Sequence, residues 1–226
     1  MIVQAEDVEG NVKEQIEQLK FNRPYMKNKD LGFNRRMAVM CKRFYQLTKH
    51  LGRVPSLNQY CRYYCNVNSA KYNGEEVTIK DKNGEWITTT KQIVYDRLYI
   101  SSTAHYREVQ LMVGINERGV KAWYDSDADL AGIDIICEID GIKCGIASYS
   151  MTSEGAKYKR VKNQYHDFEY VDVMIDAPII LGGASTVKLE NGIYLYDEAY
   201  IDGITEMVKS KIRRYNEEVT EIEKIR

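Results

Sequence analysis

The most constraining feature of this sequence is residues 132–149, where two runs of β-branched and other strand-forming residues flank Asp140-Gly141. An Asp-Gly pair favours the positive φ angles of a tight hairpin turn, so the two runs are predicted to form adjacent antiparallel strands. The same turn chemistry predicts hairpins at Asn83-Gly84 and at Asn191-Gly192. The chain is therefore expected to form antiparallel sheet at three places.

Helices are predicted on both sides of the central hairpin. Residues 103–116 and 154–166 have helical patterns, short strands are predicted at 120–124 and 171–175, and a long helix begins near residue 198. This order predicts an α+β protein. The C-terminal helix could pack on its own domain or form the seam of a homodimer, and its seven-residue repeat does not decide between the two.

The first third of the chain is predicted to be helical. A short amphipathic helix is expected at 6–20, and a longer one follows because apolar residues recur every three or four positions from Phe33 to Leu51. Gly52 is placed to end that helix, and Ser56 to begin another over residues 56–65. Two helices joined by a tight turn resemble a helix-turn-helix with 56–65 as recognition helix, although any helical hairpin gives this pattern.

Charge is strongly segregated along the chain. The segment from Lys20 to Lys71 contains twelve basic residues and one acid, a net charge of +11, whereas the whole chain carries −1 and the remainder therefore −12. A field of one sign and this size favours binding to phosphates, and docking onto the acidic remainder is the alternative. The candidate nucleic-acid-binding residues are Arg35, Arg36, Lys42, Arg43, Lys49, Arg53, Asn58, Gln59 and Arg62.

A polar stretch around Asn73-Gly74 predicts a domain boundary. The 226 residues then divide into a basic helical, nucleic-acid-binding domain (1–73) and an α/β domain (74–226). No stretch approaches the roughly 18 apolar residues of a membrane span, and the first residues are acidic where a signal peptide needs a basic and then apolar run. We expect a cytoplasmic protein without a membrane partner, its five cysteines reduced.

The order helix, strand, hairpin, helix, strand over residues 103–175 resembles the core of the PD-(D/E)XK nuclease superfamily, whose members hydrolyse phosphodiesters with Mg²⁺. The resemblance implies a restriction-endonuclease-like core with a mixed sheet. It places the central aspartate of the family at Asp134, near the start of the first hairpin strand, and the upstream acid at Glu108. These two carboxylates would be catalytic and would hold Mg²⁺.

The second hairpin strand departs from the family pattern. Ala147 and Tyr149 stand where the family has its acid and its lysine. One explanation is that the lysine has migrated to the following helix, as in some members, where Lys159 and Lys162 would stabilise charge or activate water. The other explanation is that the domain has lost catalysis and only binds.

We therefore expect a DNA-binding protein, with a metal-dependent DNA endonuclease of the kind encoded by phages and mobile elements as the leading hypothesis. The alternative is a catalytically inactive, nuclease-like DNA-binding regulator or a protein-binding inhibitor. The sequence has no glycine-rich phosphate loop of an NTPase or a nicotinamide enzyme. A metal site at Cys61 and Cys65 is disfavoured, because tight CxxC pairs are absent and cysteine is commonly a small core residue.

Overall fold

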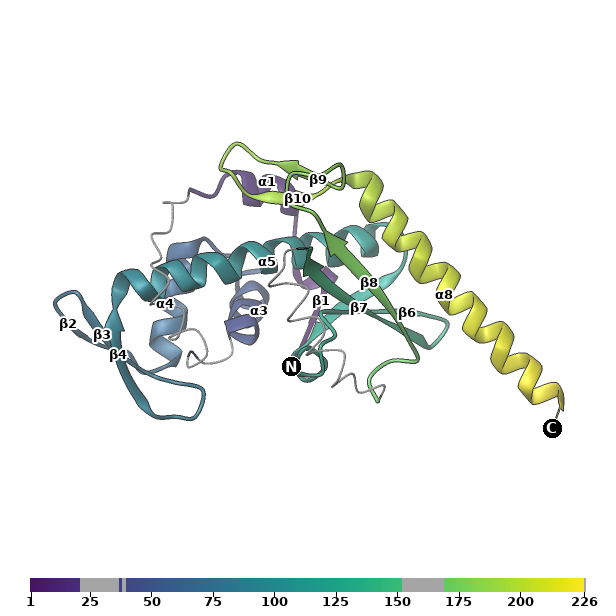
Figure 1. Cartoon of the computed structure of the whole chain (residues 1–226), viewed down its shortest axis with the longest axis horizontal. Helices are drawn as coiled ribbons and strands as arrows, with labels where there is room; N and C mark the ends of the chain where they lie inside the picture. The colour runs from purple at the N-terminus through teal and green to yellow at the C-terminus, as the bar shows by residue number, and fades with distance from the viewer. Residues whose placement is uncertain (21–36, 38–39, 152–168, 226) are drawn as a thin grey trace. The chain divides into compact units, whose positions relative to one another are not determined.

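The computed structural model describes residues 1–20, 37, 40–151 and 169–225, and the chain divides into two compact units. We call residues 8–106 the helical unit, and residues 1–7 with 107–226 the sheet unit. The chain is α+β, with a mixed sheet and a long C-terminal helix, as the sequence predicts (Figure 1). Within the described residues, no helix combines the length and the apolar character needed to cross a membrane.

The helical unit begins with helices whose ends follow their sequence signals. Asn11 caps the first helix by accepting the N–H of Glu14 at 3.2 Å. Gly52 follows the second helix with a φ of +64°, and Ser56 caps the third in a capping box with Gln59. The bounds are α1 (Val12–Glu17), α3 (Met40–Leu51) and α4 (Leu57–Val67).

Aromatic rings fill the core of the helical unit. The fully buried Phe44 of α3 meets the rings of Tyr60 and Tyr106 edge-on, with centroids 5.3 Å and 5.4 Å away. Tyr60 Oη donates to the carbonyl of Met40 at 2.7 Å, and Tyr106 Oη to that of Pro55 at 2.9 Å. Edge-to-face rings whose hydroxyls have partners pack favourably, and they join α3 and α4 to the first part of α5 (Lys91–Glu117).

A three-stranded antiparallel sheet follows α4 and belongs to the helical unit. Its order is β2-β3-β4, with strands β2 (Lys71–Asn73), β3 (Glu76–Lys80) and β4 (Trp86–Thr90). The N–H of Lys80 donates to Asn68 O at 3.0 Å, and that of Lys91 to Glu75 O at 3.0 Å, which ties the sheet to α4 and α5. A division after residue 73, as the sequence predicts, would cut through this sheet, and the compact unit extends to residue 106 instead.

The sheet unit is built on five strands in the order β1-β5-β6-β7-β8. Strands β1, β5, β6 and β7 pair antiparallel with their neighbours, and β8 pairs parallel to β7, so the sheet is mixed. Asp140 and Gly141 have φ angles of +51° and +82° and form the predicted turn between β6 and β7. The bounds are β1 (Ile2–Gln4), β5 (Lys121–Asp125), β6 (Ile135–Ile139), β7 (Ile142–Ser150) and β8 (Val173–Ile179).

Apolar side chains cover this sheet. One buried cluster contains Trp123 of β5, Ile136 of β6 and Val171. The C-terminal helix α8 (Glu198–Ile225) packs against β6, β7 and β8, and its buried positions recur every three or four residues. Farther along the same helix Ile222 is 55% exposed, and the homodimer seam stays a prediction. The unit also contains α6 (Ser126–Leu130), β9 (Thr186–Lys188) and β10 (Tyr194–Tyr196), the last two forming the hairpin predicted at Asn191-Gly192.

The prediction of a helix over residues 6–20 is wrong in part. Strand β1 pairs with β5, residues Ala5–Asp7 form the short 3₁₀ helix η1, and Gly10 adopts a φ of +73° before α1 begins. The left-handed φ of Gly10 separates η1 from α1, so the helix covers only the second part of the predicted range. The helix predicted at 154–166 lies outside the described residues.

Candidate functional site

Asp134 immediately precedes β6 and is joined to β7 by two hydrogen bonds. Its N–H donates to the carbonyl of Ile146 at 2.9 Å, and its Oδ2 accepts the N–H of Ser148 at 2.7 Å. The residue is only 6% exposed. A carboxylate this deeply buried is costly without partners, so these bonds hold Asp134 in place at the border between the two strands.

Ser148 extends this network to a second buried polar side chain. Its Oγ lies 2.7 Å from the Oη of Tyr196, which belongs to β10. The backbone of Tyr196 is fixed by Gln110 of α5, which accepts its N–H at 2.9 Å and donates to its carbonyl at 3.0 Å. Asp134, Ser148 and Tyr196 are thus brought together from segments that lie far apart in the sequence.

Arg107 and Glu108 of α5 lie close enough to Tyr196 to act on its ionisation. Burial raises the pKa of Tyr196, the hydrogen bond to Ser148 and the charge of Arg107 lower it, and the charge of Glu108 raises it. Burial lowers the pKa of Arg107, and Tyr196 and Glu108 oppose that change. Arg107 is 9% and Glu108 8% exposed, so two buried charges lie close to Tyr196.

The two β7 positions that depart from the nuclease pattern lie beside a carboxylate on the next strand. Ala147 is the Cα partner of Asp176 on β8, so the two side chains share a face of the sheet. Burial and the charge of Asp176 both raise the pKa of Tyr149. Sequence reasoning missed Asp176 because its strand was predicted to end at residue 175, and the parallel pairing could not be read from local patterns.

The carboxylates of the sheet unit are the donors that Mg²⁺ prefers, since it binds oxygen ligands. Asp134 and Glu108 are the two predicted ligands, and Asp176 is a third carboxylate, next to the position where the family has its acid. The Ser148 N–H on Asp134 is the kind of second contact that orients a metal-binding carboxylate. These oxygen donors fit Mg²⁺. The other two predicted catalytic residues, Lys159 and Lys162, lie outside the described residues.

A different pair of potential metal ligands lies in the helical unit. The sulfur of Cys41 in α3 and a ring nitrogen of His105 in α5 come within 4.8 Å of each other. Thiolate and imidazole are ligands that zinc and other transition metals favour, whereas Mg²⁺ prefers oxygen. The pair could contribute to a metal site, but it does not identify Mg²⁺.

A groove of about 620 Å³ in the helical unit is lined by cations from two elements that are distant in sequence. Lys42 and Arg43 come from the first turn of α3, whereas Lys80 ends β3 and Lys82 lies in the turn after it. The end of α4 also lines the groove, through Val67 and its C-cap residue Asn68. We call this the basic groove.

Asp81, the acid in the lining of the basic groove, is engaged by its own hairpin. It is 5% exposed, and its Oδ1 accepts the N–H of Asn83 at 2.8 Å and that of Glu85 at 3.0 Å. Its charge therefore stabilises the turn. The cationic side chains dominate the electrostatics of the basic groove, which favours an anionic ligand.

The remaining predicted nucleic-acid-binding residues are placed differently. Lys49, Arg53, Asn58 and Arg62 are exposed on the helical unit. Gln59 is half-buried, and its Oε1 accepts the N–H of Ser56 at 2.9 Å, so it serves the capping box. Sequence reasoning missed the two lysines of the hairpin, although their positions on either side of Asp81 carried the signal, because it assigned the hairpin to the other domain. Arg35 and Arg36 lie outside the described residues.

Comparisons with protein-family models, characterised proteins and solved structures give no match to this chain. The functional assignment therefore depends on the chemistry of the sites themselves.

Proposed function

We propose that this protein binds DNA through the basic groove of the helical unit. The observation that carries the proposal is the convergence of Lys42, Arg43, Lys80 and Lys82 on one groove, where Asp81 is engaged by its turn. Lysine and arginine neutralise backbone phosphates and release counterions, which is the main sequence-independent source of affinity for DNA. Cations held on two different elements can also fix the register of the protein along the DNA backbone.

The helix α4 supports this proposal by offering side chains for base contacts. Its C-terminal end lines the basic groove, and Asn58 and Arg62 are exposed along it. Asparagine and arginine are the side chains that most often form paired hydrogen bonds with adenine and guanine in the major groove. The pair α3 and α4, joined by a short turn at Gly52, has the helix-turn-helix order expected from the sequence.

The test is the fluorescence anisotropy of labelled duplex and single-stranded DNA, titrated with the protein at several salt concentrations. The variant Lys80→Ala/Lys82→Ala removes two exposed charges from the groove, and Arg213→Ala/Arg214→Ala removes two exposed charges from α8 as a matched control. We expect the first variant to flatten the slope of log affinity against log salt by roughly 2, at about 0.9 per lost phosphate contact. Equal slopes for the two variants, or no binding by the wild type, would refute the proposal.

The second candidate function is Mg²⁺-dependent cleavage of DNA by the sheet unit. It is favoured by the order α5, β5, β6, β7, β8, with an antiparallel hairpin followed by a parallel strand. Asp134, the aspartate that the nuclease resemblance picks out, comes just before β6 and accepts the N–H of Ser148 on β7. This order and this aspartate support a PD-(D/E)XK-like core.

In this candidate the chain would hold the metal and orient the scissile phosphate. Asp134 and Glu108 would bind Mg²⁺, with Asp176 taking the place of the acid missing at Ala147. Bound Mg²⁺ would supply charge neutralisation and a water of lowered pKa. Arg107 would add positive charge at the buried network, and Lys159 and Lys162 keep their predicted role in stabilising charge.

Cleavage is tested with supercoiled plasmid in Mg²⁺, Mn²⁺ or EDTA, with a gel shift run beside it. Metal-dependent nicking that is lost in Asp134→Asn and reduced in Asp176→Asn would support the endonuclease. Binding without nicking would instead favour the non-catalytic DNA-binding regulator, to which Ala147 and Tyr149 already point. A protein that neither binds nor cuts would favour a protein partner.

A further inference from the structure

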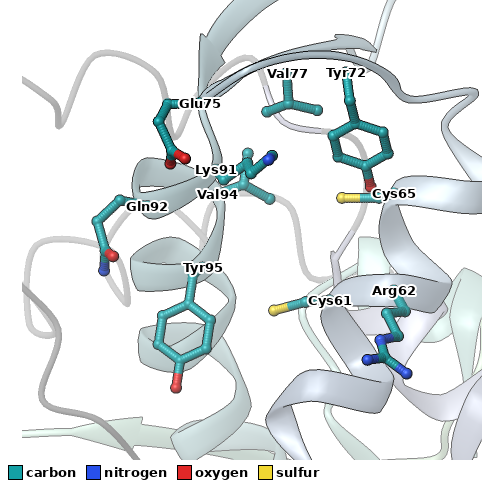
Figure 2. Close-up of a pocket in the computed structure, with 10 residues that line it drawn as sticks. All are labelled: Cys61, Arg62, Cys65, Tyr72, Glu75, Val77, Lys91, Gln92, Val94 and Tyr95. Atoms are coloured by element: carbon teal, nitrogen blue, oxygen red, sulfur yellow. The ribbon is translucent and has the colours of Figure 1, made fainter.

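A second cavity in the helical unit is separate from the basic groove and has a different character. It has a volume of about 350 Å³ and lies between α4, the β2–β3 hairpin and the start of α5 (Figure 2). This volume is at the low end of the range of roughly 300–1,000 Å³ that small-molecule sites occupy. The cavity therefore suits one small ligand rather than a chain segment.

The inner wall of this cavity is apolar and uncharged. Val77 of β3 and Val94 of α5 line it, and Figure 2 shows the sulfur atoms of Cys61 and Cys65 directed into the space between the two helices. Burial raises the pKa of Cys61 to about 12 and also raises that of Cys65. Both thiols are therefore protonated at neutral pH and behave as small apolar groups, which argues against a thiolate metal site.

Two tyrosines give the cavity aromatic surfaces. Tyr72 comes from β2 and Tyr95 from the first part of α5, so the two rings approach from different sides of the space (Figure 2). Planar heterocycles stack on such rings, and stacking tolerates any base because every base has a π face. A flat ring system is therefore the shape that this lining accepts.

The rim of the cavity combines positive charge with hydrogen-bonding groups. Arg62 of α4 and Lys91 of α5 supply two cations, and Lys91 lies in the first turn of a long helix, whose positive end also attracts anions. Glu75 and Gln92 supply acceptors and donors, and the bond from Gln92 Nε2 to Asp96 Oδ1 at 2.6 Å restrains the amide. A ligand that satisfies the whole lining has a flat ring, polar ring edges and an anionic group.

We propose that this cavity binds a nucleobase that carries a phosphate. The base stacks against Tyr95 and Tyr72, its polar edge meets Gln92 and Glu75, and the phosphate lies at Lys91 and Arg62. The ligand comes either from a free nucleotide or from an unstacked nucleotide of a nucleic acid. The second source rests on the proposed DNA binding, whereas the first does not.

The chemistry of the ligand is tested by titrating the protein with AMP, GMP, CMP and UMP in a calorimeter. Adenosine and ribose 5-phosphate serve as fragments that lack the phosphate and the base. We expect at least one monophosphate to bind at least about tenfold more tightly than either fragment, because stacking and charge neutralisation both contribute. If no monophosphate binds, or if ribose 5-phosphate binds equally well, the nucleobase pocket is refuted.

Variants then locate the ligand. Tyr95→Ala should weaken monophosphate binding by about tenfold or more through lost stacking. Lys91→Ala should lower the affinity for the monophosphate but not the affinity for adenosine. Lys91 and Gln92 are exposed, so Lys91→Ala and Gln92→Ala keep the test valid even if Tyr95→Ala fails to fold. The matched control Tyr194→Ala lies in the sheet unit and should leave affinity unchanged. Unchanged affinity in all three cavity variants would overturn the proposal.

The two sources are distinguished with DNA that carries 2-aminopurine at an unpaired or a paired position. Quenching of the unpaired probe alone, reduced in Tyr95→Ala, assigns the cavity to a nucleotide of the DNA. Binding of monophosphates without DNA binding keeps the cavity as a free-nucleotide site and refutes the proposed function. DNA binding through the basic groove, with neither monophosphate binding nor probe quenching, refutes the cavity proposal alone.

Discussion

Replacing Asp134 separates its structural role from its predicted catalytic role. The variant Asp134→Ala removes the carboxylate that accepts the N–H of Ser148 in a part-buried hydrogen bond of 2.7 Å. Hydrogen bonds to charged groups contribute about 1.5–3 kcal/mol, and a buried donor left without a partner costs about 1–3 kcal/mol. Because Ser148 is only half-buried, we expect Asp134→Ala to lower the free energy of unfolding by about 2 kcal/mol.

The variant Asp134→Asn keeps an oxygen acceptor and removes only the charge. Neutral hydrogen bonds contribute about 0.5–1.5 kcal/mol, so this variant should lose about 1 kcal/mol. If Asp134 binds Mg²⁺, the asparagine should nevertheless abolish cleavage, because a neutral amide is a much weaker ligand for a hard cation than a carboxylate. Loss of cleavage in Asp134→Ala alone would be explained equally well by the lost metal ligand and by the lower stability, so it would not separate the two roles.

The chain offers a matched control for the hydrogen bond. Asp172 also accepts the N–H of a β7 residue, that of Lys143 at 2.8 Å, but Asp172 is exposed. Water can replace its carboxylate, so Asp172→Ala should cost under about 1 kcal/mol. The difference between the two alanine variants therefore measures what burial adds to the same kind of bond.

The assay is urea unfolding followed by the fluorescence of Trp123, which is 6% exposed in the sheet unit. The second tryptophan, Trp86, belongs to the helical unit, and Trp86→Phe as a background leaves Trp123 as the reporter of the sheet unit. The reasoning is wrong if Asp134→Ala unfolds at the same urea concentration as Asp172→Ala, or if Asp134→Asn is the less stable of the two Asp134 variants.

Three further outcomes follow from local geometry. Phe44→Ala should cost about 3–5 kcal/mol of unfolding free energy in chemical denaturation, because a fully buried ring at the centre of the aromatic core is removed; a loss below about 1 kcal/mol would contradict this. Ser56→Ala should cost about 1 kcal/mol through the lost cap of α4, and Ser56→Asp, which can still cap, should restore it. The alkylation rate of Cys61, followed by mass spectrometry in iodoacetamide, should rise about tenfold per pH unit between about pH 7 and 10, since only the thiolate reacts and burial raises its pKa to about 12. A rate that levels off near the pKa of a free thiol would show that Cys61 is not buried in solution.

Turns and helix ends could be predicted from the sequence because their chemistry is local. The left-handed φ angles of Asp140 and Gly141 are those that an Asp-Gly hairpin requires, and Gly52 and Ser56 end and begin helices where their types indicate. The seven-residue apolar pattern of α8 also correctly predicted a long helix. In each case the deciding interaction joins residues that are only a few positions apart in the sequence.

The groove and the network could not be predicted because they depend on pairings between distant residues. Lys80 and Lys82 join Lys42 and Arg43 only after the β3–β4 hairpin packs with the helices, and Asn73-Gly74, which reads as a boundary, is a turn inside that sheet. Asp176 reaches the neighbourhood of Ala147 only through parallel pairing. Periodicity cannot show which strands become neighbours, so the sequence could give candidate residues but not their partners.

The two candidate sites differ in what they cost the fold, and this difference bears on their roles. Exposed lysines such as Lys80 and Lys82 cost the fold little, so a binding groove built from them can be assembled on any stable hairpin. Arg107, Glu108 and Asp134 are each less than 10% exposed, and desolvating charges opposes folding even when the charges have partners. The sheet unit already has an apolar cluster around Trp123 and the packing of α8 to stabilise it. Buried charges whose desolvation opposes folding are therefore the stronger candidates for chemistry, and the exposed cations for binding.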